Sequence, residues 1–464
     1  METGIQWFQM PLDTRFCGYD NLYLLQMKVA VISPRFPFSG RVPMVPPILE
    51  YLGALTLKAQ PDAEIELIDA NVSESRPEDI DADIIGISSM TATVTWAYSL
   101  ADELRALGKR VVLGGIHPTA LPEEAKKHAD AVVVGEAESV WGKLLKDALR
   151  GQLEPFYYGE RLCLDDLPLP LAGRVKGPYK FRAVFTARGC PYKCSFCSVR
   201  KFFGDTIRYR PVRNVVEEVE KCTGKIYFNG DDNIWGGDVQ RAIELFTELS
   251  KGTPKYWYGF GDLRAPQSPA GDRLLAAAQA SGLFSVWAGW ETSSGEGLKI
   301  YHASAKQGRD REDAVRRIKD HGIDVTLFVV LGGRTDAAGD FERAVALAGR
   351  LGVSIHPVLL TPLPGTELYD EYKPYLLPDR GWEFFTGVNA VFEHPTMSSI
   401  EREKMYYETS LKLLGSGRIM NHLCEISWKG FPMTHLMSLM MQLPMKRAMH
   451  KAYAEWKSYM RSAL

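Results

Sequence analysis

Short apolar runs alternate with amphipathic stretches in two long parts of the chain. In the first part, residues 27–155, the runs have the length of buried strands. We predict strands over 29–33, 65–69, 84–88, 111–114 and 131–134. Helical patterns fill the intervals, and this alternation is typical of a parallel sheet with helices on both faces. The first part is therefore predicted to be a doubly wound α/β domain.

The second part, residues 181–375, repeats the alternation with six runs. We predict strands over 183–186, 225–229, 256–261, 285–290, 325–331 and 353–360. Six strands are too few for a closed eight-stranded barrel, so we expect an open, partial (β/α)6 barrel. The remaining segments are predicted to be an N-terminal extension (1–26), a linker (156–180) and a helical C-terminal region (376–464).

The last predicted helix, residues 434–463, combines six methionines with several lysines and arginines. Such a helix can pack its apolar side on a core. A flexible methionine surface can equally contact an apolar substrate or a membrane surface. The pattern alone leaves these alternatives open.

Composition is that of an ordinary folded protein, with 45% hydrophobic and 24% charged residues, which excludes a mostly disordered chain. Lys and Arg number 55 against 57 Asp and Glu. This balance provides no general positive field, so we do not expect a nucleic acid partner. We find neither an apolar run long enough to span a bilayer nor a secretory signal pattern, and we therefore expect a cytoplasmic protein.

Three of the seven cysteines, Cys190, Cys194 and Cys197, follow the first strand of the second part. Thiolates spaced in this way on one loop can converge on one metal centre. No fourth cysteine lies nearby. The loop is therefore expected to bind an iron–sulfur cluster with one open iron, and a zinc site completed by a histidine is the alternative.

The loop sequence RGCPYKCSFC, at residues 188–197, resembles the signature of the radical S-adenosylmethionine (SAM) superfamily. The resemblance implies a [4Fe–4S] cluster held by the three cysteines and SAM bound at the open iron. It implies that one electron cleaves SAM and that the resulting 5′-deoxyadenosyl radical abstracts hydrogen from the substrate. It also implies an electron donor such as flavodoxin or ferredoxin, and it puts Phe196 near the adenine of SAM.

Other predicted strand ends are similar to those of the same superfamily. Asp231 and Asp232 end the second strand and are candidates to reach the SAM amino group, although aspartates in this position also cap turns. Glu291, in the sequence GWET, resembles the acidic residue of a G-x-E-S element that contacts the ribose or carboxylate of SAM. Gly332 and Gly333 end the fifth strand, where glycines admit the cofactor.

The order of the two parts and the sequence TPLPGT at residues 361–366 resemble the superfamily branch with an N-terminal cobalamin-binding domain. In open parallel sheets, ligands bind beyond the carboxyl ends of the strands. The resemblance thus implies cobalamin contacts at those ends of the first part. The candidates are Ser88, Ser89, Thr91, Gly114, Gly115, His117, Gly135 and Glu136.

One motif of classical cobalamin enzymes is absent. The D-x-H-x-x-G sequence that supplies an axial histidine is replaced by SPRFPFSG at residues 33–40. His117 is the one tempting imidazole, but it follows the fourth strand rather than the first. It can be a turn or phosphate-contacting residue, or a cobalt ligand.

The resemblance implies a cobalamin-dependent radical SAM enzyme, and our preferred reaction is methylation of an unactivated carbon of a small-molecule substrate. In this branch, one SAM methylates the corrinoid and a second SAM supplies the radical. Oxidative cyclisation or rearrangement without methyl transfer is an alternative, as is a non-catalytic corrinoid-binding sensor or carrier. The sequence neither singles out a catalytic residue nor names the substrate.

Overall fold

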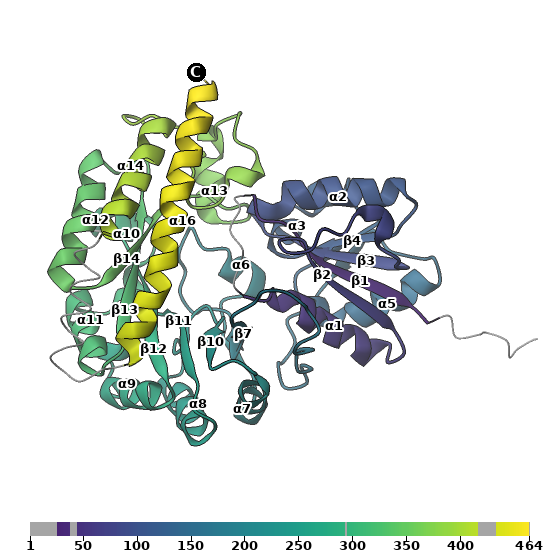
Figure 1. The fold of residues 1–464 in the computed structure, drawn as a ribbon, viewed down its shortest axis with the longest axis horizontal. Helices are drawn as coiled ribbons and strands as arrows, with labels where there is room; N and C mark the ends of the chain where they lie inside the picture. The colour runs from purple at the N-terminus through teal and green to yellow at the C-terminus, as the bar shows by residue number, and fades with distance from the viewer. Residues whose placement is uncertain (1–25, 38–43, 293–294, 416–432, 464) are drawn as a thin grey trace, which may run out of the picture.

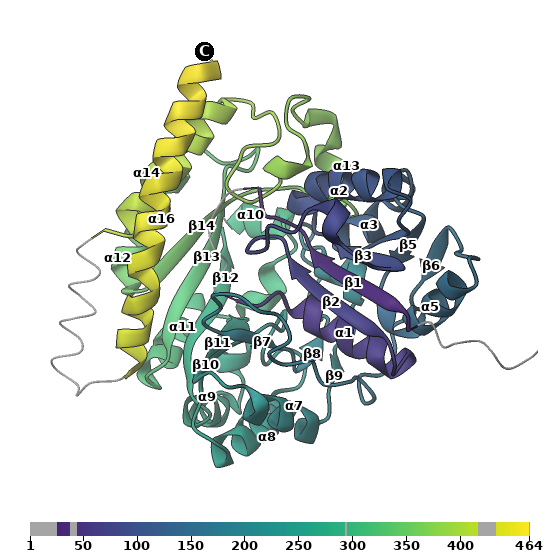
Figure 2. The same cartoon turned by 45° about the vertical axis from the view of Figure 1, so that its right-hand side comes forward.

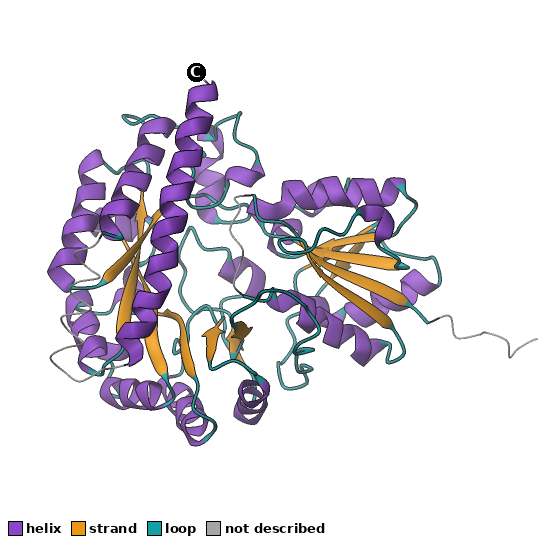
Figure 3. Cartoon of the chain, viewed as in Figure 1, coloured by secondary structure: helices purple, strands orange, loops and turns teal. Residues whose placement is uncertain are grey.

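The computed structural model describes residues 26–37, 44–292, 295–415 and 433–463 (Figure 1). Two six-stranded sheets form two α/β units that lie side by side, and the C-terminal helices pack on the second unit (Figure 3). The predicted N-terminal extension lies outside the described residues up to residue 25.

The first sheet has the strand order β2-β1-β3-β4-β5-β6, and every neighbouring pair is parallel. Its strands are β1 (Lys28–Ser33), β2 (Glu64–Asp69), β3 (Ile84–Ser88), β4 (Val111–Gly114), β5 (Ala131–Val134) and β6 (Phe156–Tyr158). Its helices are α1 (Pro47–Ala59), α2 (Val94–Ala106), α3 (Ile116–Ala120), α4 (Pro122–Lys126) and α5 (Trp141–Leu149). Alternate strand residues enter two cores, one beneath α1 and α5 and one beneath α2. The predicted doubly wound sheet is confirmed.

Strand β6 differs from the prediction, which assigned its residues to a linker. Its three residues pair in parallel with β5 at the edge of the first sheet. Tyr157 is buried, whereas the side chain of Tyr158 is 66% exposed. Three residues with one buried side chain give too short an apolar run to indicate a strand in the sequence.

The second sheet has the order β14-β13-β12-β11-β10-β7, again with only parallel neighbours. Its strands are β7 (Arg182–Val184), β10 (Ile226–Asn229), β11 (Tyr256–Gly261), β12 (Leu283–Glu291), β13 (Asp324–Leu331) and β14 (Ser354–Leu359). The helices along it are α7 (Val212–Lys221), α8 (Val239–Lys251), α9 (Gly271–Ala280), α10 (Gly295–Ile300), α11 (Arg311–Asp320) and α12 (Ala338–Leu351). Strands β7 and β14 are both edges, so the predicted open, partial barrel is confirmed.

A small hairpin-like element carries the cysteine loop. Strand β8 (Ala187–Arg188) pairs in antiparallel fashion with β9 (Arg208–Tyr209), and α6 (Val199–Phe203) lies between them in sequence. The three cysteines lie between β8 and α6. Their loop therefore starts a few residues beyond β7, the first strand of the barrel.

The C-terminal region is helical as predicted, with α14 (Ser399–Leu413) and α16 (Met433–Ala463), and α13 (Glu367–Tyr372) precedes it at the end of the barrel segment. Helix α16 runs along α14 (Figure 2), where Trp456 Nε1 donates a hydrogen bond of 2.7 Å to Glu403 Oε2. The side chains of Met437, Met440, Met441 and Met460 lie outside the described residues. Within the described part of the chain, no helix is long and apolar enough to cross a membrane.

Candidate active site

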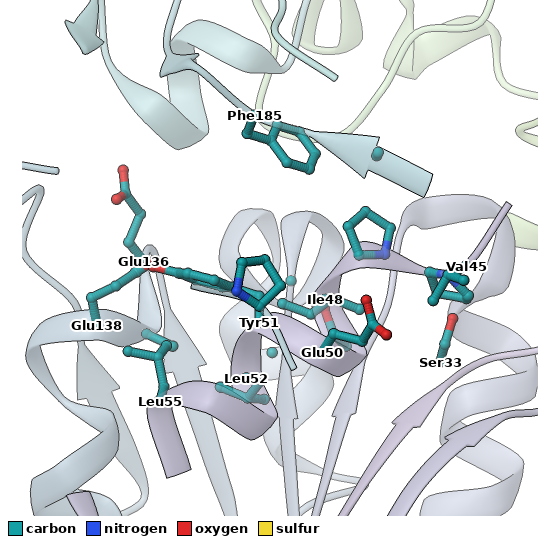
Figure 4. Close-up of a pocket in the computed structure, with 18 of the residues that line it drawn as sticks. Ser33, Val45, Ile48, Glu50, Tyr51, Leu52, Leu55, Glu136, Glu138 and Phe185 are labelled. Carbon is teal, nitrogen blue, oxygen red and sulfur yellow. The ribbon is translucent and has the colours of Figure 1, made fainter. Parts of the chain in front are cut away.

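A cavity of about 550 Å³ lies between the two α/β units. The loops that follow β1, β3, β4 and β5 line it from the first unit, together with α1, and residues around β7, β8 and α6 line it from the second. Figure 4 shows Phe185 of the second unit facing Ile48, Glu50 and Tyr51 of α1. The cavity thus lies at the carboxyl edge of the first sheet, where doubly wound folds bind their ligands.

Six of the eight residues predicted to contact cobalamin line this cavity: Ser88, Ser89, Gly114, Gly115, Gly135 and Glu136. Ser89 is buried, and its hydroxyl makes no hydrogen bond to any residue that the structure describes. A buried, unpaired hydroxyl on a cavity wall indicates a missing polar partner. A large, mostly apolar ligand with polar edges fits this wall.

Gly115 fits its position for a backbone reason. Its φ angle is 101°, and a Cβ atom there would lie 2.5 Å from the carbonyl oxygen of Ser89. Only glycine lets β4 and the loop after β3 approach so closely without strain. The close approach shapes the cavity wall next to the Ser89 hydroxyl.

Thr91 and His117 do not line the cavity. The His117 ring is fully buried, with Nδ1 3.2 Å from Thr91 Oγ1 and Nε2 3.2 Å from Glu124 Oε1. Glu124 also accepts a hydrogen bond from Trp382 Nε1, and the contact with His117 holds the pKa of the Glu124 carboxyl below its usual range. Both ring nitrogens have protein partners, so neither is available to a cobalt ion in this structure. Thr91 is the partner of the His117 ring.

Glu136 lines the cavity, but its carboxylate already pairs with two arginines of the second unit. Its carboxylate is buried and accepts hydrogen bonds from Arg188 Nη1 (2.8 Å) and from Arg208 Nη1 (3.1 Å). Arg188 Nη1 also lies 2.6 Å from Glu138 Oε1, which accepts a hydrogen bond of 2.7 Å from the Tyr51 hydroxyl. These five residues form an ion-pair network, which we call the interdomain network, between the first unit and the β8–β9 pair. Sequence reasoning missed it.

The interdomain network ends next to the cysteine loop, because Arg188 stands two positions before Cys190. Burial and the neighbouring Glu138 carboxylate raise the pKa of Tyr51, so its hydroxyl stays protonated and remains a donor. Removing one partner of a buried ion pair leaves an uncompensated charge. The network therefore fixes the start of the cysteine loop relative to the first sheet.

The cysteine loop is held from its other side by the barrel helices. Ser195 N donates to the carbonyl oxygen of Tyr301 at 3.1 Å, and Leu368 N of α13 donates to the carbonyl oxygen of Ser195 at 3.0 Å. The Phe196 ring meets the Tyr301 ring edge to face, with centroids 5.8 Å apart. The three cysteines themselves are half-buried.

No three His, Cys, Asp or Glu side chains of the described residues form a group that could hold a single metal ion. A [4Fe–4S] cluster places each of three cysteines on a different iron, so its ligands need not converge on one point. Three half-buried cysteines on one anchored loop suit such a cluster.

Asp231 and Asp232 hold the backbone that leads to this loop. Asp231 is buried and accepts hydrogen bonds from Thr186 N (2.6 Å) and Ala187 N (3.0 Å), and burial raises its pKa to about 7. Asp232 accepts a hydrogen bond of 3.3 Å from Gly189 N, and burial raises its pKa to about 6. For Asp231 these contacts match the turn-capping alternative.

Glu291 and the two glycines lie at the carboxyl edge of the second sheet. Glu291 is buried, has a φ angle of 63°, and lies where the register of β12 against β13 shifts. Such strained positions concentrate at functional sites. A Cβ atom on Gly333 would lie 2.4 Å from the Tyr301 hydroxyl, and the carbonyl oxygen of Gly332 accepts a hydrogen bond of 3.3 Å from Arg402 Nη1. The glycines thus make room for these neighbouring side chains.

Comparison with known families agrees with both units. The B12 binding domain model matches residues 45–145, and the radical SAM superfamily model matches residues 184–348. The chain is a radical SAM enzyme with a B12-binding domain. Its cofactors are a [4Fe–4S] cluster, SAM and cobalamin.

Two curated relatives come from Chlorobaculum tepidum. Bacteriochlorophyllide d C-8(2)-methyltransferase is 27% identical over 82% of this chain and 90% of its own length. Bacteriochlorophyllide d C-12(1)-methyltransferase is 28% identical over 71% of this chain and 74% of its own length.

Among solved structures, the cobalamin-dependent SAM radical enzyme OxsB, with aqua-cobalamin and SAM bound, has a TM-score of 0.67 with this chain. The match covers 94% of this chain and 82% of OxsB at 13% identity. At this identity the likeness concerns the fold, and it extends over both α/β units.

Proposed function

We propose that this radical SAM enzyme is a cobalamin-dependent methyltransferase that acts on an unactivated carbon of a small molecule. The observation that carries the proposal is the cavity whose walls come from the carboxyl edge of the first sheet and from the residues around β8. A methyl donor on one wall and a radical source at the neighbouring loop can then serve one substrate. The two bacteriochlorophyllide methyltransferases support the choice of methyl transfer and favour a ring-containing, tetrapyrrole-like substrate.

In this proposal Cys190, Cys194 and Cys197 hold the cluster. Ser88, Ser89, Gly114, Gly115 and Gly135 line the corrinoid, and Phe196, Asp232 and Glu291 are the remaining candidates for contacts with SAM. When bound, the cluster with SAM supplies one-electron chemistry and cobalamin supplies a transferable methyl group. His117 and Thr91 do not line the cavity, so the proposal gives them no direct contact with cobalamin.

The chain's own side chains contribute orientation and exclusion of water. Apolar groups such as Ile48, Leu52 and Phe185 line the cavity, which limits access of water to its interior. The interdomain network holds the two walls in one relative position, and fixed positions lower the entropy cost of bringing reactants together. An external donor such as flavodoxin or ferredoxin would deliver the electrons.

We also propose domain boundaries. The first domain spans residues 27–158, since β6 pairs with β5. The linker follows over residues 159–180, the partial barrel over 181–375 and the helical region over 376–464.

The test is anaerobic reconstitution of the full chain with iron, sulfide and cobalamin, followed by reductant, methyl-labelled SAM and magnesium chlorophyllide. We expect one cobalamin per chain and both S-adenosylhomocysteine and 5′-deoxyadenosine as SAM products. Formation of 5′-deoxyadenosine alone, with no bound corrinoid, would overturn methyl transfer and favour oxidative cyclisation or rearrangement. The absence of SAM cleavage in the loaded, reduced protein would favour a corrinoid-binding sensor or carrier.

A further inference from the structure

One face of the second sheet carries a continuous layer of aromatic side chains. Along each strand, alternate residues point to opposite faces. Tyr227, Trp257 and Val286 belong to the core beneath the helices, whereas their neighbours Phe228, Tyr258 and Trp287 lie on the other face. We define the aromatic layer by its members on β10 to β14: Phe228, Tyr258, Phe260, Trp287, Phe328 and His356.

The rings of the layer contact one another across five neighbouring strands. Ring centroids are 5.1 Å apart for Phe228 and Tyr258, 5.3 Å for Phe260 and Trp287, and 4.9 Å for Phe328 and His356. Each of these three pairs is directly opposite in the strand register. Five strands at a spacing of about 4.8 Å give a surface about 19 Å wide.

The layer is partly exposed, although α16 contacts two of its strands, β12 and β13. Apart from Tyr258, which is buried, its members are half-buried, and none belongs to the hydrophobic cores formed by the described residues. Aromatic faces attract other flat π systems, and the gain adds to the burial of their area. A surface of this width suits a planar, multi-ring ligand better than a single ring.

His356 is the one titratable imidazole in the layer. Its ring makes no hydrogen bond within the described part of the chain, and burial alone lowers its pKa, so it is uncharged near neutral pH. Phe328 packs against it at an interplanar angle of 41°. A neutral imidazole in an apolar setting has a nitrogen lone pair to donate, and this makes it a good ligand for a metal ion.

We propose that the aromatic layer binds a planar, conjugated macrocycle with a metal ion at its centre, and that His356 is the axial ligand of that metal. The inference rests on the proposed function and deepens it, because it names residues that would select the substrate. Stacking on Trp287 and Phe328 would orient the ring plane. Coordination by His356 would distinguish the metal-loaded macrocycle from the metal-free one.

The experiment titrates the full chain, loaded with cluster and cobalamin but without SAM or reductant, with zinc protoporphyrin IX and with metal-free protoporphyrin IX. We expect the zinc compound to bind about tenfold more tightly and its main absorption band to move to longer wavelength on binding. His356→Ala should lose both the band shift and the preference for zinc, while the metal-free compound binds as before. Added imidazole should restore the shift in this variant.

Two further variants separate coordination from stacking. Trp287→Leu should weaken binding of both compounds and leave the zinc band shift in the fraction that binds. His128→Ala is the matched control, because His128 lies in the first unit, paired with Asp102, and its removal should change neither compound's binding. Cobalamin content and cluster absorbance of each variant report whether it has folded.

Equal binding of the two compounds without a band shift would overturn the assignment of His356, as would a shift that persists in His356→Ala. No binding of either compound to folded, loaded protein would overturn the macrocycle itself. The assay needs no methyl transfer, so its failure is distinct from that of the proposed function. If the zinc compound binds as expected but the separate reconstitution assay with SAM and reductant yields no methylated product, the methyltransferase is contradicted while the layer's ligand stays in place.

Discussion

The two six-stranded parallel sheets use their faces differently. In the first sheet the middle residues of β1, β3, β4 and β5 are buried in unbroken runs, because helices cover both faces. In the second sheet β10 and β14 alternate between buried and half-buried residues, whereas the central strands β11, β12 and β13 are buried at most positions, and α16 contacts β12 and β13. A sheet covered on both faces can offer a ligand only its carboxyl edge, whereas the second sheet also has half-buried aromatic side chains on one face.

This difference suggests a division of labour in which the first sheet holds cobalamin at its edge. The second sheet would hold the cluster and SAM at its edge and the substrate on its aromatic face. The variants below test whether these places can be disturbed separately, in order of decreasing effect.

Cys194→Ala should have the largest effect. Removing one of three cluster ligands is expected to abolish cluster assembly and all SAM cleavage, because the cluster passes the electron to SAM. Cobalamin binding should be preserved, since its proposed contacts lie on the first sheet. Iron and sulfide content, SAM products and bound cobalamin measure this. Cys163→Ala, at an exposed cysteine outside the loop, is the control and should behave as wild type; a Cys194→Ala protein that still cleaved SAM would contradict the ligand assignment.

Glu136→Gln changes a residue of the first unit but should also affect the cluster loop of the second unit. The substitution leaves Arg188 and Arg208 without their shared carboxylate in a buried setting, which we expect to lower the free energy of unfolding by about 3–5 kcal/mol. Cluster occupancy should also fall, because Arg188 anchors the start of the cysteine loop. Urea unfolding and iron content of Glu136→Gln and of the exposed control Glu160→Gln decide the matter. Unchanged values in both would show that the interdomain network does not position the loop.

How far the sequence predicted the fold depends on how each strand is buried. Runs such as Val29–Ile32 and Ile84–Ile87 are apolar at nearly every position, so both strands were predicted close to their observed bounds. Strand β6 was missed because its three residues form an edge strand. The aromatic layer was also missed, since Phe228 and Tyr258 alternate with the equally apolar Tyr227 and Trp257.

In the candidate site, features set by local sequence were predicted and contacts between distant residues were not. The cysteine spacing is local, and it predicted the cluster loop at the edge of the barrel. The interdomain network joins Glu136 to Arg188, 52 positions away in the other unit, and nothing in either local sequence selects that partner. His117 stands at a strand end like the true lining residues, and only its contacts with Thr91 and Glu124 show that it belongs to the core.

Asp231 should make stability depend on pH in the second unit. Burial raises its pKa in the folded chain to about 7, above the value of an exposed aspartate. Between about pH 4 and 7 the folded chain therefore binds a proton that the unfolded chain has released, and stability falls as pH rises, by at most about 1.4 kcal/mol per pH unit. Above pH 7 this contribution to the slope ends.

Asp231→Asn should flatten this slope, because the amide does not titrate but can still accept hydrogen bonds from Thr186 N or Ala187 N. The measurement is urea unfolding at about pH 5.5, 6.5 and 7.5. Asp205→Asn, at an exposed aspartate, is the control and should keep the wild-type slope. Equal slopes in all three proteins would mean that Asp231 is ionised throughout and that its backbone contacts outweigh its burial.

Ser89→Ala should have the smallest effect, confined to the edge of the first sheet. The Ser89 hydroxyl has no partner among the described residues, so its removal should leave the free energy of unfolding of the cobalamin-free protein unchanged or slightly higher. If the hydroxyl bonds the corrinoid, cobalamin affinity should fall by about 0.5–1.5 kcal/mol, or roughly two- to tenfold. Equilibrium dialysis with cobalamin measures this, with Ser75→Ala, at an exposed serine, as control. An unchanged affinity would mean that cobalamin makes its polar contacts with other atoms of the cavity wall. Cluster assembly on the second sheet should be normal in either case.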